Sequence, residues 1–166
     1  MTEPFTVALA GNPNVGKSTV FNALTGLRQH TGNWPGKTVE TAQGRFTTDC
    51  RAYALIDLPG TYSLSPHSEE ERVAREYLIT GDYDAVVVVC DATCLRRSLG
   101  LALQVLELTP NVILCVNLMD EAKRKGTSLN GDLVTAFAAG FPAYLHRNMI
   151  ISPRVQDLSI PNVPSG

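Results

Sequence analysis

The sequence lacks any long apolar run, and this shortage argues against a membrane-spanning helix. Its longest apolar stretches, residues 85–90 and 112–116, are far shorter than the ~20 residues that a bilayer requires. No charged segment followed by an apolar one opens the chain, so nothing indicates a secretory leader. We therefore expect this chain to be soluble and cytosolic.

The sequence also lacks a large excess of charge of either sign, and it lacks closely spaced pairs of cysteines. The formal net charge is −2, and the longest basic cluster, residues 123–125, is expected at a solvated helix end. No nucleic-acid surface is indicated. The four cysteines form no C-x-x-C pair, and Cys90 and Cys115 lie inside apolar runs, so we expect reduced, unbridged thiols. No cluster of His, Cys and carboxylates has the spacing of a metal site.

Short apolar runs alternate with helical patterns along the chain, which is typical of an α/β fold. Only residues 48–50 join the second and third expected strands, too few for a crossover helix, so segment 39–47 is predicted as an antiparallel edge strand. The other strands are parallel and end at one rim, where ligands of such sheets bind. Strands are expected at residues 5–10, 39–47, 51–57, 84–91 and 112–117, and helices at 17–25, 69–80 and 95–108.

The C-terminal part of the chain carries weaker signals. Residues 133–139 can form a helix and residues 141–145 a sixth strand, whereas the proline-containing segment after residue 146 has no apolar period. The sequence predicts one domain over residues 1–146, a mostly parallel six-stranded sheet with helices on both faces. An irregular or disordered tail is expected over residues 147–166.

The most informative motif is GNPNVGKS at residues 11–18, which follows the first expected strand and satisfies every fixed position of G-x-x-x-x-G-K-[ST]. Gly11 and Gly16 allow a tight turn that brings backbone N–H groups onto phosphate oxygens. Lys17 reaches the β- and γ-phosphates, and Ser18 offers its hydroxyl to Mg²⁺ at the positive end of a helix. The expected phosphate-binding residues are Gly11, Asn12, Pro13, Asn14, Val15, Gly16, Lys17, Ser18 and Thr19.

Two motifs at the ends of later strands restrict the class of nucleotide that the site is expected to bind. The DLPG motif at residues 57–60 offers the Asp57 carboxylate to hold Mg²⁺ through water, and the Gly60 N–H to bind a γ-phosphate. The N-x-x-D motif at residues 117–120 is the guanine signal of small GTPases, because the Asp120 carboxylate matches the N1–H and amino group of guanine together. Asp120 therefore selects GTP over ATP, and Asn117 should tie its loop to the phosphate loop. The expected base-binding residues are Asn117, Met119 and Asp120.

Residues 29–40 are too polar and too rich in Gly and Pro for a regular element, and too long for a simple turn. We expect a mobile switch loop there. Thr38 lies just before the second strand, where its hydroxyl can contact Mg²⁺ only when the γ-phosphate is present. Trp34, beside Pro35 and Gly36, is expected to be a partly exposed lid, with a core position as the alternative.

Five segments, in this order, resemble the cytosolic GTPase domain of the ferrous iron transport protein B family (FeoB): GNPNVGKST, GNWPGKTVE, DLPGTYSLSP, AREYL and NLMD. The resemblance covers about residues 3–126. It implies a small-GTPase-like P-loop NTPase fold and GTP hydrolysis coupled to Fe²⁺ uptake through a membrane-embedded portion, at the cytoplasmic face of the bacterial inner membrane. It also implies a helical domain after the GTPase fold, and we expect neither part within residues 1–166. For the full-length protein, the resemblance is compatible with assembly into a homo-oligomer.

The same resemblance implies that Asn14 ligates K⁺ beside the phosphates, as in potassium-stimulated members of the family. Such a cation would neutralise developing charge as an arginine finger does. Thr61 follows Gly60, where many GTPases have the glutamine that orients water, so slow intrinsic hydrolysis is expected. The residues expected to act in hydrolysis are Lys17, Thr38, Gly60 and Asn14, and those expected at Mg²⁺ are Ser18, Thr38 and Asp57.

One departure from the family leaves alternatives open. The base-capping loop, S-A-[KLR] or S-T-R in the family, has its nearest counterpart at Ser152-Pro153-Arg154, where the proline removes one N–H donor. A nucleotide-binding module with a degenerate base-capping loop is therefore an alternative. A regulatory GTPase of the ribosome-assembly or tRNA-modification type shares the PNVGKS loop, but it would need a basic RNA-binding appendage.

Overall fold

The computed structural model describes residues 3–27 and 29–127 of the chain. Within them, six strands form one sheet in the order β2-β3-β4-β1-β5-β6. The elements follow in the order β1 (Phe5–Gly11), α1 (Lys17–Thr25), β2 (Gln29–Asn33), β3 (Glu40–Thr47), β4 (Ala52–Asp57), α2 (Glu69–Thr80), β5 (Ala85–Asp91), the short 3₁₀ helix η1 (Ala92–Cys94), α3 (Leu95–Leu108), β6 (Val112–Asn117) and α4 (Met119–Arg124).

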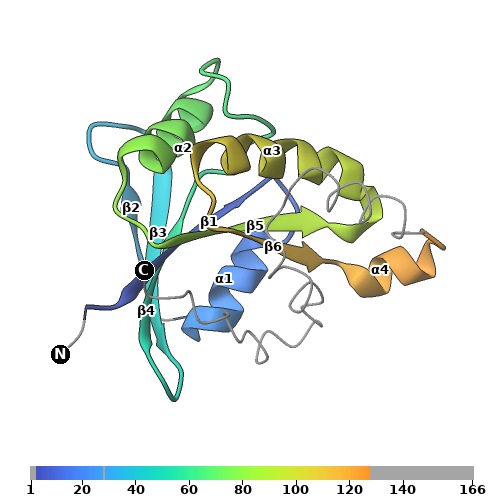
Figure 1. Cartoon of the computed structure of the whole chain (residues 1–166), viewed down its shortest axis with the longest axis horizontal. Helices are drawn as coiled ribbons and strands as arrows, with labels where there is room; N and C mark the ends of the chain where they lie inside the picture. The colour runs from blue at the N-terminus through green and yellow to red at the C-terminus, as the bar shows by residue number, and fades with distance from the viewer. Residues whose placement is uncertain (1–2, 28, 128–166) are drawn as a thin grey trace.

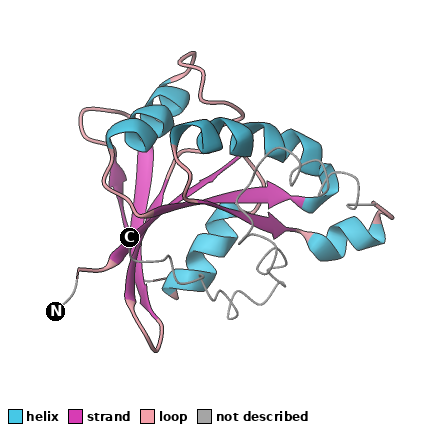
Figure 2. Cartoon of the chain, viewed as in Figure 1, coloured by secondary structure: helices cyan, strands magenta, loops and turns pink. Residues whose placement is uncertain are grey.

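The sheet separates two layers of helices. α2 and α3 lie on one face, and α1 lies on the other (Figures 1 and 2). β1 pairs in parallel with β4 and β5, and β6 continues the parallel order beyond β5. β1, β5 and β6 are mostly apolar and buried, as expected for parallel strands with both faces covered, whereas in β4 only Leu55 is buried. The phosphate-loop segment leaves β1 at the carboxyl ends of the parallel strands, where the predicted motifs meet.

The edge of the sheet differs from the sequence prediction. β3 is antiparallel to β4, as predicted, but it also pairs with β2, so β2 is the edge strand. The expected switch loop over residues 29–40 is therefore wrong in its first part, because Gln29–Asn33 is a strand. All five residues of β2 are exposed, so no apolar alternation marks it. The loop that remains spans residues 34–39.

The other predicted elements within the described residues are confirmed. The three predicted helices have the bounds of α1, α2 and α3, and the basic cluster follows as expected at the end of α4, an additional helix. The sheet has six strands among the described residues, and β2 is one of them although the sixth strand was expected over residues 141–145. The expected helix over 133–139, the expected strand over 141–145, the base-capping candidate and the tail lie outside the described residues.

The four cysteines carry free thiols, as expected. Cys90 and Cys115 are buried in β5 and β6, and burial raises the pKa of the Cys115 thiol to about 12. In the part of the chain that the structure describes, no group of three His, Cys or carboxylate side chains could hold a metal ion. No helix in that part is long and apolar enough to cross a membrane.

Candidate nucleotide-binding site

The phosphate loop connects β1 to α1 through two residues with left-handed backbone. Asn14 has φ 65°, and Gly16 has φ 85° and is the N-cap of α1. No side chain caps α1, and its first turn contains no acidic residue, so the N–H groups there are free to meet an anion. In the loop and first turn, Gly11, Asn12 and Val15 are buried, Pro13, Gly16 and Lys17 are half-buried, and Asn14, Ser18 and Thr19 are exposed.

Asn117, at the end of β6, holds the phosphate loop in place. Its Nδ2 donates to the carbonyl oxygen of Val15 at 3.0 Å, which is the tie that the sequence predicted. The amide lies so close that a Cβ on Gly16 would come within 2.2 Å of Asn117 Nδ2. Glycine is therefore required at position 16 for two reasons, its backbone angle and the approach of Asn117.

Lys17 forms an ion pair with Asp57 at the end of β4. Their side chains are only 11% and 19% exposed, so both charges lie mostly out of solvent. Burial raises the pKa of the Asp57 carboxyl, and the nearby Lys17 ammonium offsets only part of that rise. The pair places the two groups that the sequence assigned to phosphate and Mg²⁺ side by side.

The segment after Asp57 runs along the phosphate loop. The N–H of Leu58 donates to the carbonyl of Leu9 at 3.0 Å, and the N–H of Thr61 donates to the carbonyl of Gly11 at 3.1 Å. A Cβ on Gly60 would lie 3.4 Å from Pro13 Cα. The structure therefore brings together the first two motifs, as the sequence predicted from their places at strand ends.

Glu71 organises the loop between Gly60 and α2. Its carboxylate accepts hydrogen bonds from the Ser63 hydroxyl and from the N–H groups of His67 and Ser68, at 3.1 to 3.2 Å. Ser68 Oγ accepts from the Glu71 N–H, which completes a capping box. Desolvation raises the pKa of Glu71, but these hydrogen bonds outweigh it and hold the pKa below its ordinary value. This role was not predicted from the sequence, although the S-x-x-E pattern at residues 68–71 signals a capping box.

Thr38 lies against α2. Its Oγ1 donates to Glu69 Oε2 at 2.8 Å, and this is its one side-chain hydrogen bond among the described residues. Thr38 is exposed, whereas Glu69, which sequence reasoning also missed, is half-buried in the first turn of α2. The structure therefore does not join Thr38 to Ser18 or Asp57 by a hydrogen bond.

Trp34 packs edge-on against Tyr77 of α2, with ring centroids 5.3 Å apart and planes at 61°. The indole is half-buried and contacts the hydrophobic core, so it combines features of the expected exposed lid and of the alternative core position. Burial, and the nearby charge of Asp82, raise the pKa of Tyr77 to about 12, so this ring is neutral at physiological pH.

The base-binding motif begins where β6 ends. Leu118 has left-handed backbone with φ 62°, which turns the chain directly into α4. Met119 is half-buried, and Asp120 is exposed in the first turn of α4. Asp120 has no hydrogen bond or ion pair within residues 3–27 and 29–127, so both carboxylate oxygens can accept hydrogen bonds from a ligand.

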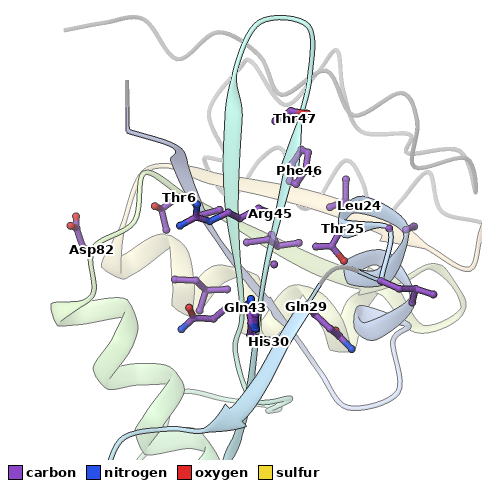
Figure 3. Close-up of a pocket in the computed structure, with 17 residues that line it drawn as sticks. Thr6, Leu24, Thr25, Gln29, His30, Gln43, Arg45, Phe46, Thr47 and Asp82 are labelled. Carbon is purple, nitrogen blue, oxygen red and sulfur yellow. The ribbon is translucent and has the colours of Figure 1, made fainter. Parts of the chain in front are cut away.

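A hollow of about 1030 Å³ lies away from these motifs, beside α1 and the strands β3 and β4 (Figure 3). Leu24 of α1 and Arg45 and Phe46 of β3 are among its lining residues. None of its lining residues belongs to the phosphate loop, to residues 57–60 or to residues 117–120. The hollow is therefore separate from the candidate nucleotide site.

Comparisons with known proteins identify relatives of this chain. A family model described as ferrous iron transport protein B matches residues 5–138. The chain is 45% identical to the Fe(2+) transporter FeoB of Escherichia coli (strain K12) over 135 residues, which cover 79% of this chain and 18% of that protein. The chain thus spans less than a fifth of the length of the curated relatives it matches.

Solved structures match as well. The G domain of the T. maritima FeoB iron transporter has a TM-score of 0.71 and 51% identity, covering 74% of this chain and 77% of that chain. The cytosolic domain of the same transporter in its GMPPNP form has a TM-score of 0.71 and 52% identity, covering 74% and 48%. These matches confirm the P-loop NTPase fold that the sequence predicted.

Proposed function

Because the chain belongs to the ferrous iron transport protein B family, we propose that it binds GTP and hydrolyses it to GDP and phosphate at the carboxyl-end rim of its sheet. The hydrogen bond from Asn117 Nδ2 to the Val15 carbonyl carries this proposal. This bond holds the expected guanine-binding motif next to the expected phosphate-binding loop, so that a single nucleotide could contact both. The GMPPNP form of the T. maritima cytosolic domain supports a guanine nucleoside triphosphate as that ligand.

The phosphates would lie over the amino end of α1. Backbone N–H groups between Asn14 and Ser18 would donate to their oxygens, and Lys17 would exchange the Asp57 carboxylate for β- and γ-phosphate oxygens. The Gly60 N–H would donate to the γ-phosphate, since the segment around Gly60 already follows the phosphate loop. At the other end, Asp120 would hold the guanine edge, with Met119 beside it.

The residues present also fit two cations. The Ser18 hydroxyl and the Asp57 carboxylate are oxygen donors of the kind that Mg²⁺ prefers, and Thr38 would join them in the triphosphate state. The amide oxygen of Asn14, on an exposed residue with left-handed backbone, would be the protein's oxygen ligand for K⁺. Bound cations would neutralise negative charge that develops on the phosphates during hydrolysis.

Intrinsic hydrolysis is proposed to be slow. Thr61 stands where a water-orienting glutamine would follow the DLPG motif; it is buried, and its N–H is engaged by Gly11. A short side chain in that position has little reach toward an attacking water. Backbone groups and Thr38 are then left to place the nucleophile.

The wider role follows from the relatives rather than from this site. We propose that the domain, over residues 1–146, couples its nucleotide state to Fe²⁺ uptake by a membrane-embedded portion of the same protein. Its place would be the cytoplasmic face of the bacterial inner membrane, and the full-length protein would be able to form a homo-oligomer. The E. coli relative, described as an Fe(2+) transporter, supports this context.

Nucleotide titrations and phosphate-release assays on the purified chain test the proposal. GTP is expected to bind at least about 100-fold more tightly than ATP, because the Asp120 carboxylate would face unmatched groups on adenine. K⁺ is expected to speed phosphate release relative to Na⁺, and Asn14→Ala to remove that difference. Equal affinity for ATP would contradict the site. Hydrolysis at the same rate with K⁺ and Na⁺ would favour the alternative of a regulatory GTPase. Absence of hydrolysis would favour a nucleotide-binding module with a degenerate base-capping loop.

A further inference from the structure

The loop over residues 34–39, which connects β2 to β3, rests on α2 at two points (Figure 1). Thr38 meets Glu69 in the first turn of α2, and Trp34 meets Tyr77 two turns later. Residues 69, 73 and 77 are four apart, so they lie along one stripe of the helix. The loop therefore lies along the side of α2 that faces it, held by a polar contact at one end and an aromatic contact at the other.

The loop is compact in itself. The Lys37 N–H donates to the Trp34 carbonyl at 2.9 Å, which closes a turn with Pro35 at its second position and Gly36, at φ 70°, at its third. The Trp34 N–H donates in turn to the Val39 carbonyl at 2.8 Å. Because these bonds link the residues on both sides of Thr38, a displacement of Thr38 is transmitted to Trp34.

The packing of the loop on α2 is incomplete. A hollow of about 270 Å³ lies between them, lined by Trp34, Pro35 and Lys37 of the loop and by Val73, Glu76, Tyr77 and Thr80 of α2. The Trp34 Nε1 is buried without a hydrogen-bond partner among the described residues. A buried N–H without an acceptor disfavours the docked position of the loop. The hydrogen bond from Thr38 to the Glu69 carboxylate favours that position, because a charged acceptor strengthens such a bond.

We propose that Glu69 holds Thr38 away from the nucleotide and thereby sets the preference of the site for GDP over GTP. This inference rests on the proposed role of Thr38 at Mg²⁺ and the γ-phosphate. Thr38 must leave Glu69 to reach them, so a triphosphate binds at the expense of the Glu69 contact, whereas GDP leaves that contact intact. By linkage, removing the Glu69 carboxylate favours the triphosphate state and leaves GDP affinity nearly unchanged.

Glu69→Ala tests the proposal against a matched control. Glu70 occupies the same first turn of α2 and carries the same charge, but it makes no hydrogen bond or ion pair within the described residues. Glu70→Ala therefore reproduces the loss of a favourable charge at a helix N-terminus without touching Thr38. Glu69→Gln retains an acceptor but not its charge, so it gives an intermediate effect and a variant close to the original in shape.

Two measurements on the full chain report the outcome. Titration with GMPPNP and with GDP, each with Mg²⁺, gives the affinity ratio; Glu69→Ala should shift it toward GMPPNP by about two- to tenfold, as expected for one net hydrogen bond. Trp34 is the only tryptophan in the chain, so its emission reports the loop directly. In the GDP state of Glu69→Ala, this emission should move toward that of the unchanged chain with GMPPNP.

The results separate the inference from the function on which it rests. The inference would be overturned if Glu69→Ala and Glu70→Ala had the same ratio of GMPPNP to GDP affinity and if Trp34 emission stayed as in the unchanged chain. Thr38→Ala provides the second test. If Thr38→Ala weakens GMPPNP but Glu69→Ala behaves as its control, Thr38 keeps its proposed role and only the Glu69 inference fails. If Thr38→Ala leaves the ratio unchanged, the proposed role of Thr38 fails, and the inference fails with it.

Discussion

The phosphate loop and the loop over residues 34–39 are held by different means. The first is fixed from the core outward: it follows a buried strand, its backbone is tied to Asn117, and an added methyl group at Gly16 has no room. The second is exposed over residues 35–38, rests on α2 through Thr38 and Trp34, and has no atom within 4 Å of an added Cβ at Gly36. The difference separates a loop that is fixed by its surroundings from one that would have to change partners if Thr38 binds the nucleotide as proposed.

The largest expected difference between the two loops is in the effect of removing a lysine side chain from each of them. Lys17→Ala should weaken GDP binding by about 100-fold or more, because the charge-assisted contacts of Lys17 to phosphate are lost and the Asp57 carboxylate would face the phosphates without a counter-ion. Lys37→Ala should change GDP affinity less than about twofold, since exposed charges interact weakly. Calorimetric titration with GDP measures both. Comparable losses in the two variants would remove the distinction between the loops.

A glycine substitution in each loop sharpens the comparison. Gly16 and Gly36 have similar left-handed φ values, 85° and 70°, but only Gly16 has a neighbour within 4 Å of an added Cβ. Gly36→Ala should lower the free energy of unfolding by about 1 kcal/mol, the strain of the backbone alone. Gly16→Ala should lower it by about 3 kcal/mol or more, because Asn117 must also move. Urea unfolding measures both, and equal losses would show that Asn117 yields freely.

The smallest expected effect concerns Glu71, which orders the segment between Gly60 and α2. Its pKa is lowered in the folded state, so its contribution to stability is present above the ordinary glutamate pKa of 4.5 and is lost as pH falls through the lowered pKa. Glu71→Gln should therefore reduce the melting temperature at pH 7, and the difference from the unchanged chain should shrink below pH 4.5. Glu70→Gln is the control. A pH-independent difference for Glu71→Gln would contradict this account.

Sequence patterns predicted those parts of the fold in which apolar periodicity reports burial. β5 and β6 are uninterrupted apolar runs, and the helices α1 to α3 end at the residues expected. β2 was not predictable in this way, because its five side chains are exposed and its pairing with β3 uses only backbone groups. That pairing depends on β3 being in place, which no local pattern around Gln29–Asn33 encodes.

The candidate site shows the same division. The tie between Asn117 and the phosphate loop was predicted from the N-x-x-D motif at a strand end, since the ends of parallel strands lie at the same rim. The partner of Thr38 was not, because Glu69 lies 31 residues further along and only the approach of the loop to α2 joins them. Whether Thr38, Ser18, Asp57 and Asn14 hold cations stays a prediction.

The ion pair between Lys17 and Asp57 has a consequence for how any measured affinity is interpreted. The lysine that would bind phosphate already has a counter-ion supplied by the protein. Association with a nucleotide would then be an anion exchange, in which one negative group replaces another beside the same ammonium. The observed binding constant would report the difference between two attractions, and a variant that weakens the Lys17–Asp57 attraction would bind more tightly without gaining any contact with the nucleotide.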